Sequence, residues 1–182
     1  MPPISDKKIL DLYQQPAKRS YAFKLLVEKY QVRVYWIIRR MILNHDDTND
    51  VMQESFIKIW KNLPDFREES SLYSWIYRVT INEVYNFFRM KKRVHTIQTT
   101  ALTDEMIQVM TEDPWFDGDK AQVKLQKAIL QLPEKQQIVF NLRYFEEIKY
   151  EEMSKILDTS QGSLKASYHW AVKKIEEYLK SH

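Results

Sequence analysis

Aromatic and basic side chains alternate along residues 66–93, a pattern that could bind a nucleic-acid strand. The aromatic ones are Phe66, Tyr73, Trp75, Tyr77, Tyr85, Phe87 and Phe88, and the basic ones are Arg67, Arg78, Arg89, Lys91, Lys92 and Arg93. Unpaired bases stack on aromatic faces while cations neutralise the phosphates, and this combination holds single-stranded DNA. The competing interpretation is that Trp75, Ile76 and Val79, which stand at helical spacing, belong to the core.

A second candidate surface lies on the helix expected at 161–180. With about 100° per residue, its core face contains Leu164, Tyr168, Ala171, Val172, Ile175 and Leu179, and the opposite arc contains Gly162, Lys165, Ala166, His169, Trp170 and Lys173. With the helix expected at 150–157 and the turn between them, it has the proportions of a helix-turn-helix. Such an arc suits a DNA major groove, and Ser160 and Ser163 could bind a phosphate at the helix N-terminus. A plain helical hairpin with a solvated face is the alternative, but an indole such as Trp170 is unfavourable in water and favours a partner.

The side chains that could perform acid–base or metal chemistry are not spaced to do so. No histidine has a second histidine or a carboxylate three or four residues away, the spacing of a metal site on a helix. The histidines are His45, His95, His169 and His182. Adjacent glutamates, as in Glu68-Glu69, Glu146-Glu147 and Glu151-Glu152, diverge on a helix rather than converge on one proton. We therefore expect no catalytic residue, no metal, no cofactor and no enzymatic activity.

The apolar spacing that would position these surfaces is helical throughout. Stripes at intervals of three and four residues predict helices over 6–14, 20–43, 48–63, 72–92, 120–131, 134–145, 150–157 and 161–180. A polar break is expected from Asn44 to Asp47, followed by Thr48 as one N-cap, and Ser71 is expected to cap the next helix. Only two glycines occur in the chain, so we expect an all-α protein without a phosphate-binding glycine loop.

Composition and charge indicate the cellular compartment of the protein and its domain organisation. The 182 residues include no cysteine, which excludes disulfides and thiolate metal sites and fits a reducing cytoplasm. No apolar run is long enough to insert into a membrane, and the N-terminus lacks the pattern of a signal peptide. The net charge is +6 over 1–95, −6 over 96–119 and +3 over 120–182. Two basic segments around an acidic one predict two small helical domains with a linker, and a polyanionic partner such as nucleic acid.

Two stretches of the sequence resemble the extracytoplasmic-function (ECF) sigma factors of bacterial RNA polymerase, in the sigma-70 superfamily. The first contains DVMQESFIKIW at 50–60, Phe66-Arg67, Ser71, SWIYR at 74–78 and Asn82, and is similar to the family's second conserved region. The second contains LPEKQ at 132–136, LRY at 142–144, YEE at 150–152 and SQGSLK at 160–165, and is similar to the fourth region. The stretch 96–119 is too short for the large middle domain of housekeeping sigma factors.

The resemblance implies the domains and the function. It implies region 2 at 1–95, an acidic linker at 96–119 that runs through the polymerase channel, and region 4 at 120–182. Such a protein is a transcription initiation factor that binds core RNA polymerase and directs it to promoters. The implied partners are the clamp of the largest subunit, the flap of the second-largest subunit, double- and single-stranded promoter DNA, and an anti-sigma factor.

A polymerase-binding surface is expected on the helix at 48–63. Its core face contains Met52, Phe56, Ile59 and Leu63, and the opposite side contains Asp50, Gln53, Glu54, Ile57 and Lys61. A solvated face explains the charged residues but not Ile57, whereas a docking surface with an apolar anchor and a polar rim explains all five. The family grips the polymerase clamp with this helix, so the resemblance assigns that role to these five residues.

The resemblance also assigns DNA contacts. For the −10 element, from which the family captures a flipped-out base, the residues are Phe66, Arg67, Ser71, Arg78, Asn82 and Arg89. For the −35 duplex they are Ser160, Gly162, Ser163, Lys165, Ala166, His169, Trp170 and Lys173. Two other functions stay open at this point. A two-domain helical adaptor would bind only protein, and an ordinary helix-turn-helix repressor would need a dimer interface and no polymerase-gripping helix.

Overall fold

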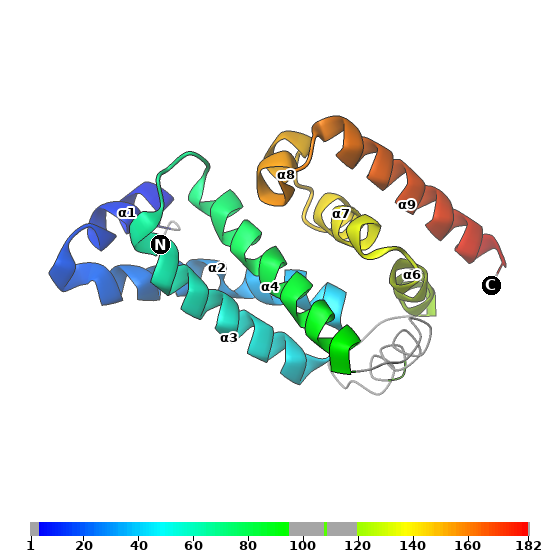
Figure 1. Ribbon diagram of the computed structural model, residues 1–182, viewed down its shortest axis with the longest axis horizontal. Coiled ribbons are helices and arrows are strands. Elements are labelled where there is room, and N and C mark those ends of the chain that lie inside the picture. Colours follow the sequence, from blue (N-terminus) through cyan, green and yellow to red (C-terminus); the bar gives the residue numbers. More distant parts are fainter. Residues whose placement is uncertain (1–3, 95–107, 109–119, 182) are drawn as a thin grey trace.

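A computed structural model describes residues 4–94, 108 and 120–181, which form α-helices and short 3-10 turns and contain no strand. The first module comprises α1 (Asp6–Tyr13), η1 (Pro16–Lys18), α2 (Arg19–Ile42), α3 (His45–Asn62), η2 (Leu63–Asp65) and α4 (Leu72–Val94). The second module comprises α6 (Lys120–Leu130), α7 (Glu134–Tyr144), α8 (Tyr150–Leu157) and α9 (Gln161–Ser181). Figure 1 shows the two modules side by side, with α4 next to the second one. The all-α prediction is confirmed for this part of the chain.

The long helix α2 forms the centre of the first module and packs against α1, α3 and α4. Its apolar stripe, uninterrupted by proline or glycine, buries Leu26, Val34, Ile38 and Met41 completely. The short helix α1 is tied to α2 by its Asp6 carboxylate, which accepts hydrogen bonds from the Tyr30 hydroxyl at 2.8 Å and from Lys29 Nζ at 2.6 Å. Burial, together with the hydrogen bond to Asp6, raises the pKa of the Tyr30 hydroxyl.

The start of α3 differs from the sequence prediction. Asn44, rather than Thr48, caps this helix, because its Oδ1 accepts the backbone N–H of Asp47 at 2.8 Å. Leu43 adopts a positive φ of 65° at the end of α2 and so turns the chain directly into the new helix. The expected polar break over Asn44–Asp47 and the Thr48 cap are therefore wrong. Thr48 is instead buried inside α3, where its hydroxyl donates to the Asn44 carbonyl at 2.6 Å.

The predicted Ser71 cap agrees with the structure, which shows two further helix ends fixed by local side chains. Ser71 caps α4, since its Oγ accepts the backbone N–H of Ser74 at 3.1 Å. Ser160 caps α9 in the same way, accepting the N–H of Ser163 at 3.3 Å. Asp158 ends α8 with a left-handed φ of 48°, a conformation that Asp tolerates better than most residues. The predicted helix boundaries agree with the structure to within about two residues, except at the start of α3, which lies three residues before the predicted one.

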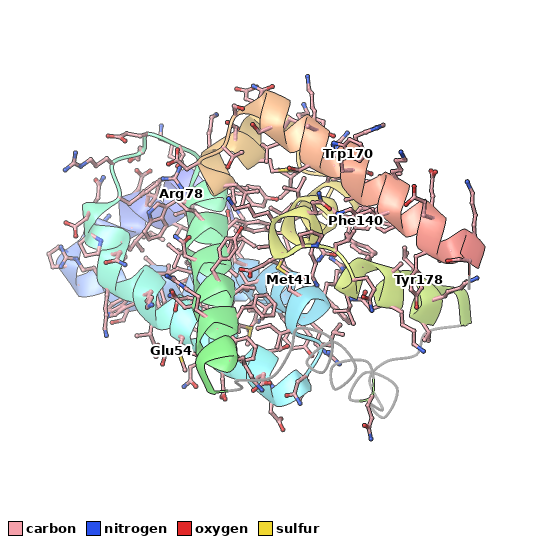
Figure 2. All side chains as sticks on the ribbon, turned by 45° about the vertical axis from the view of Figure 1, so that its right-hand side comes forward. Met41, Glu54, Arg78, Phe140, Trp170 and Tyr178 are labelled. Atoms are coloured by element: carbon pink, nitrogen blue, oxygen red, sulfur yellow. The ribbon has the colours of Figure 1, made fainter. Side chains whose placement is uncertain are left out.

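The second module packs around α9, which contacts α6, α7 and α8. A small core joins Ala128 and Ile129 of α6 to Ala171 and Ile175 of α9, with Phe140 of α7 between them (Figure 2). The Phe140 ring stacks nearly parallel on that of Tyr168, with 5.9 Å between the ring centroids. This packing fixes the inner face of α9, and the opposite face is left to solvent.

The two modules are not separate bodies in this structure. Buried residues of α7 and α8, among them Leu142, Met153 and Ile156, belong to the same continuous apolar cluster as Ile76 and Tyr77 of α4. Helix α4 contacts α8, and α2 contacts α7. The sequence predicted two domains and a linker, and it contained no signal that these two domains would share a core.

Candidate nucleic-acid interface

The helix-turn-helix predicted near the C-terminus is present as α8, the turn at 158–160, and α9. The expected core face of α9 is confirmed, since Leu164, Ala171 and Ile175 are buried. All of the candidate −35 residues are exposed: Ser160, Gly162, Ser163, Lys165, Ala166, His169, Trp170 and Lys173. The geometry therefore presents one continuous exposed surface on the N-terminal two-thirds of α9.

Trp170 dominates this surface. Its side chain is 50% exposed, an unusual degree for an indole, and α9 forms one border of the molecule (Figure 2). The Lys173 ammonium lies 5.3 Å from the centre of the indole ring, and the His169 ring lies 5.8 Å from it. Nearby, Lys165 Nζ lies 5.8 Å from the ring of Tyr150. Cations held beside flat aromatic faces can bind phosphates and bases together.

Gly162 has no packing role that would require a glycine. A Cβ atom added at this position would meet nothing within 4 Å. Its φ is not positive, so no backbone strain requires a glycine there either. Glycine inside a helix costs about 1 kcal/mol relative to alanine. The packing of α9 therefore does not explain the glycine in its first turn.

The candidate −10 residues lie on one face of α4 and on the loop before it. Ser71, Arg78, Asn82 and Arg89 are spaced by seven, four and seven residues, which places them on a single helix face, and all four are exposed. Arg67 in the loop is exposed as well. Phe66 is partly buried, and its ring lies 5.2 Å from that of Trp75.

The aromatic residues around this face pack mostly inward. Tyr77 is fully buried, while Tyr73, Trp75, Tyr85, Phe87 and Phe88 are partly buried against the first-module core. Ile76 is fully buried too. The core interpretation is therefore correct for most of this pattern. The pattern therefore forms no fully open stacking surface, although Phe66, Tyr73, Trp75, Tyr85, Phe87 and Phe88 each remain partly exposed.

Helix α8 covers one side of the −10 face. Arg78 Nε donates a hydrogen bond of 2.9 Å to the backbone carbonyl of Lys155 at the end of α8, and Figure 2 shows Arg78 where α4 meets α8. One turn earlier, the hydroxyl of Ser74, which is 1% exposed, donates to the Glu152 carboxylate. The hydrogen bonds from Ser74 and then from Lys155 lower the pKa of Glu152. The sequence did not predict the contact between Ser74 and Glu152. Helical periodicity predicts which face of a helix is buried, but it does not predict which other helix packs against that face.

A third contact between the modules involves α2. The Arg40 guanidinium pairs with the Glu146 carboxylate and lies 4.6 Å from the centre of the Phe145 ring. The side chain of Gln126 also donates to the Arg40 carbonyl at 3.1 Å. Charged and polar contacts on α2, α4, α6 and α8 therefore accompany the apolar core that joins the two modules.

Several polar atoms near this contact are buried without a hydrogen-bond partner among the described residues. They are Gln137 Nε2 and both side-chain polar atoms of Asn141. Burial raises the pKa of Tyr77, and Tyr73 and the negative charge of Glu146 add to the rise. Asn141 stands one turn before Phe145, the residue that contacts Arg40. Each such unpaired group costs about 1–3 kcal/mol.

The candidate polymerase surface on α3 is exposed as expected. Asp50, Gln53, Glu54, Ile57 and Lys61 all face solvent, and Ile57 is 38% exposed. The predicted core side is confirmed by Phe56, Ile59 and Leu63, which are buried, and Met52 is partly buried. Figure 2 shows Glu54 and Trp170 at well separated places, so the α3 and α9 surfaces are distinct.

Residues 4–94, 108 and 120–181 contain neither a metal-binding cluster nor a membrane-spanning helix. No cluster of three or more acidic or histidine side chains in them could hold a metal ion. None of the helices there has the length and hydropathy to cross a bilayer. The acidic linker at 96–119 lies outside the described residues except for Gln108.

Family models match both modules. The model for Sigma-70 region 2 matches residues 26–94, and the model for Sigma-70, region 4 matches residues 122–175. The RNA polymerase sigma-H factor of Pseudomonas aeruginosa is 29% identical, over 96% of this chain and 93% of its own length. The ECF RNA polymerase sigma-E factor of Haemophilus influenzae is 28% identical, over 97% of this chain and 96% of its own length.

Two solved structures have a similar fold. The sigma factor RpoE of Bartonella quintana, in complex with the anti-sigma factor NepR, aligns with a TM-score of 0.68 and 20% identity, covering 87% of this chain and 96% of that one. CnrH, in complex with the cytosolic domain of CnrY, aligns with a TM-score of 0.69 and 19% identity, covering 97% of both chains.

Proposed function

Because the chain belongs to the ECF group of the sigma-70 family and is a promoter-directing transcription initiation factor, we propose that its two modules divide this task. Its partners are core RNA polymerase and promoter DNA. The first module binds the polymerase and captures the −10 element, and the second module binds the −35 duplex. The proposed boundaries are 1–95, 96–119 and 120–182.

The exposed arc of α9 is the observation that carries the DNA-binding part of this proposal. A half-exposed indole, a cation beside it and an unnecessary glycine occupy one face of the second helix of a helix-turn-helix. We propose that Ser160 and Ser163 bind a phosphate at the N-terminus of α9, and that Lys165, His169 and Trp170 face base edges or the backbone.

The proposed roles in the first module follow from exposure. Ile57 is the apolar anchor of the surface that docks on the polymerase clamp, and Asp50, Gln53, Glu54 and Lys61 form its polar rim. The −10 contacts are made by the exposed face of α4 and the loop before it, with Arg78 and Asn82 central. Because most aromatic side chains nearby are packed inward, the pocket for a flipped base depends on the loop at Phe66–Ser71.

The remaining parts of the proposal concern partners and setting. The structures of RpoE and CnrH were each solved in complex with a protein partner, and we propose that an anti-sigma factor also binds this chain. We propose that the protein works in the cytoplasm without catalysis of its own, that its second module touches the polymerase flap, and that its linker occupies the RNA path.

Promoter-dependent transcription by sigma-free core polymerase tests the proposal. Adding the full-length protein to core polymerase and a genomic DNA template should start RNA synthesis at discrete sites. RNA 5′ ends would be mapped with and without the protein. A helical adaptor that binds only protein would produce no new start sites, and a repressor would lower transcription by a holoenzyme without supporting it from core polymerase alone.

A further inference from the structure

The side chains on the outward ridge of α9 contain almost no hydrogen-bonding groups. Gly162, Ala166 and Trp170 are four residues apart, so they form one ridge of the helix surface. This ridge lies opposite Leu164 and Ile175, which are buried. All three ridge residues are exposed, and the indole N–H is the only side-chain donor among them. In a major groove, the ridge would present a bare backbone, a methyl group and an indole to the bases.

The residue type that most often reads guanine is absent from α9. Arginine bound to guanine O6 and N7 is the commonest specific contact in a major groove. Residues 120–182 contain a single arginine, Arg143 of α7. Its Nη1 donates to the backbone carbonyl of Ile148 at 3.2 Å, and its guanidinium lies 5.2 Å from the centre of the Tyr150 ring. Arg143 thus holds the loop between α7 and α8, and the ridge of α9 has no comparable donor.

The lysines of α9 stand beside the ridge and beyond its end. Lys165 Nζ lies 5.8 Å from an aromatic ring of α8, and Lys173 Nζ lies 5.3 Å from the centre of the Trp170 indole. Lys174 is turned to α7, where its Nζ donates to a side-chain oxygen at 3.1 Å. Residues 161–174 contain these three lysines and no acidic residue. Positive charge around an apolar ridge suits the phosphates that border a groove.

The polar neighbours of the ridge contact other side chains of the protein. The Ser160 hydroxyl donates to Ser163 Oγ at 3.0 Å, within the cap of the helix. The His169 ring packs against the indole of Trp170, with 5.8 Å between the ring centroids and an angle of 72° between the planes. The groups of α9 that remain to read bases are therefore chiefly a methyl group and two flat rings.

We propose that α9 reads thymine. The Ala166 methyl group and the Trp170 indole contact C5-methyl groups of thymines in the −35 duplex, while Lys165 and Lys173 bind phosphates beside them. Thymine carries the only methyl group on the major-groove edges of the four bases, and apolar side chains contact it. This inference rests on the proposed function for the identity of the ligand as promoter duplex, and it adds the base that the duplex must contain.

Replacement of thymine by uracil tests the assignment, because uracil lacks only the methyl group. The α9 surface is exposed in this structure, so the full-length protein can be used without polymerase. Duplexes that it binds are selected from a random-sequence pool, and the enriched duplexes should share thymine at defined positions. Deoxyuridine at those positions should weaken binding about fourfold for each methyl group lost, as measured by fluorescence anisotropy. Deoxyuridine at the other thymines of the same duplex should have no effect.

Three results of this experiment would overturn the proposal. One is equal affinity for the thymine and uracil duplexes. Another is enrichment of shared guanines without shared thymines, which would assign α9 to guanine. The third is a selected pool with no shared sequence, which would mean that α9 reads no base.

Variants of α9 connect the methyl groups to named side chains. In Ala166→Gly and Trp170→Ala, the ratio of the affinities for the thymine and uracil duplexes should fall toward one, because each variant removes the protein partner of the methyl group. Lys165→Ala should weaken binding to both duplexes by the same factor and keep the wild-type ratio. A wild-type ratio in both ridge variants would show that the methyl groups are read elsewhere and would reject the proposal.

Ser167→Gly is the matched control for Ala166→Gly. Ser167 is partly buried and lies off the ridge, and its replacement by glycine also lowers helix propensity. This variant should keep the wild-type ratio. Circular dichroism reports any loss of helix content in Ala166→Gly. Trp170→Ala raises helix propensity instead, so it tests the ridge even if Ala166→Gly is partly unfolded.

Promoters mapped with core polymerase supply a second probe and separate the two proposals. Deoxyuridine at the −35 thymines should weaken binding of the holoenzyme, and deoxyuridine in the spacer between the two elements should not. If no start sites appear while the selected duplexes keep their dependence on thymine, the error lies in the proposed function. If discrete start sites appear and binding to the −35 element is insensitive to uracil, the assignment of α9 to thymine is wrong.

Discussion

Lys58 of α3 forms an ion pair of 2.7 Å with Glu83 of α4, whose side chain is almost buried and also accepts a hydrogen bond from Asn86 at 3.0 Å. This pair joins the two helices that we propose bind polymerase and the −10 strand. Lys58→Ala should lower the free energy of unfolding by about 1–3 kcal/mol, because the Glu83 charge stays in place without its cation. Lys61→Ala on the exposed side of α3 should change it by less than about 0.5 kcal/mol. Urea unfolding of both variants makes the comparison, and equal effects would show that the pair is not structural.

Ile57 should act on binding rather than on folding. Ile57→Asp places a charge at the proposed anchor and should weaken core polymerase binding by more than about 1 kcal/mol, with little change in melting temperature. Ile59→Asp, two residues away but fully buried, should instead unfold the first module. Competition binding to core polymerase and thermal unfolding distinguish the two. A large loss of stability in Ile57→Asp with intact binding would reverse the assignment.

Gly162→Ala should raise the stability of the fold and lower the affinity for DNA. The added methyl group meets no neighbour, so α9 should gain up to about 1 kcal/mol of stability from helix propensity. Affinity for −35 duplex DNA should fall, because the methyl group would stand where the backbone approaches the partner. A gain in stability with unchanged affinity, measured by fluorescence anisotropy, would mean that DNA does not approach this turn.

Substitution of Lys165 distinguishes a phosphate contact from a base contact between α9 and the DNA duplex. If it neutralises a phosphate, Lys165→Ala should weaken promoter binding and reduce the slope of log K against log salt by about 0.9. Lys180→Ala, at the far end of α9 and also exposed, should leave that slope unchanged. Loss of preference at a single base pair would assign Lys165 to a base edge instead. Unchanged binding would remove this part of α9 from the groove.

The contact between Ser74 of α4 and Glu152 of α8 should weaken in acid. The hydrogen bonds from Ser74 and Lys155 lower the pKa of Glu152, so its stabilising contribution is fully present above the ordinary carboxyl range. That contribution is lost as pH falls through the lowered pKa. The chain has no cysteine, so spin labels can be attached at Ser20→Cys on α2 and Glu176→Cys on α9, both exposed positions. We expect the distance between these labels to stay short at pH 7 and to lengthen below about pH 4. The neighbouring charged groups are Glu151 and Lys155 on α8 and Arg78 on α4.

A glutamine at position 152 provides the control for the pH experiment. Glu152→Gln cannot titrate, so opening in this pH range should disappear in that variant. Circular dichroism at each pH separates opening of the modules from unfolding of their helices. A label distance that stays constant in the wild type until the helices melt would contradict the assignment to Glu152.

The sequence by itself determined the helices and the outward faces of the candidate site. Periodicity and capping depend on neighbours within about four residues, so they predicted the exposed arc of α9, the exposed side of α3 with Ile57, and the Ser71 cap. The Thr48 cap was wrong for the same local reason, since Asn44 competes for the same helix start.

Only the tertiary structure determined which buried helix faces pack against each other. Ser74 and Glu152 are 78 residues apart, and a helical apolar stripe specifies that a face is buried without naming its partner. For that reason the alternating aromatics of 66–93 fitted a stacking surface and a core equally well. The structure buries Tyr77 and packs the other six partly against the shared core. For the same reason the contact of α4 with α8 could not be foreseen, because it depends on long-range complementarity of shape and charge between helices that local spacing does not encode.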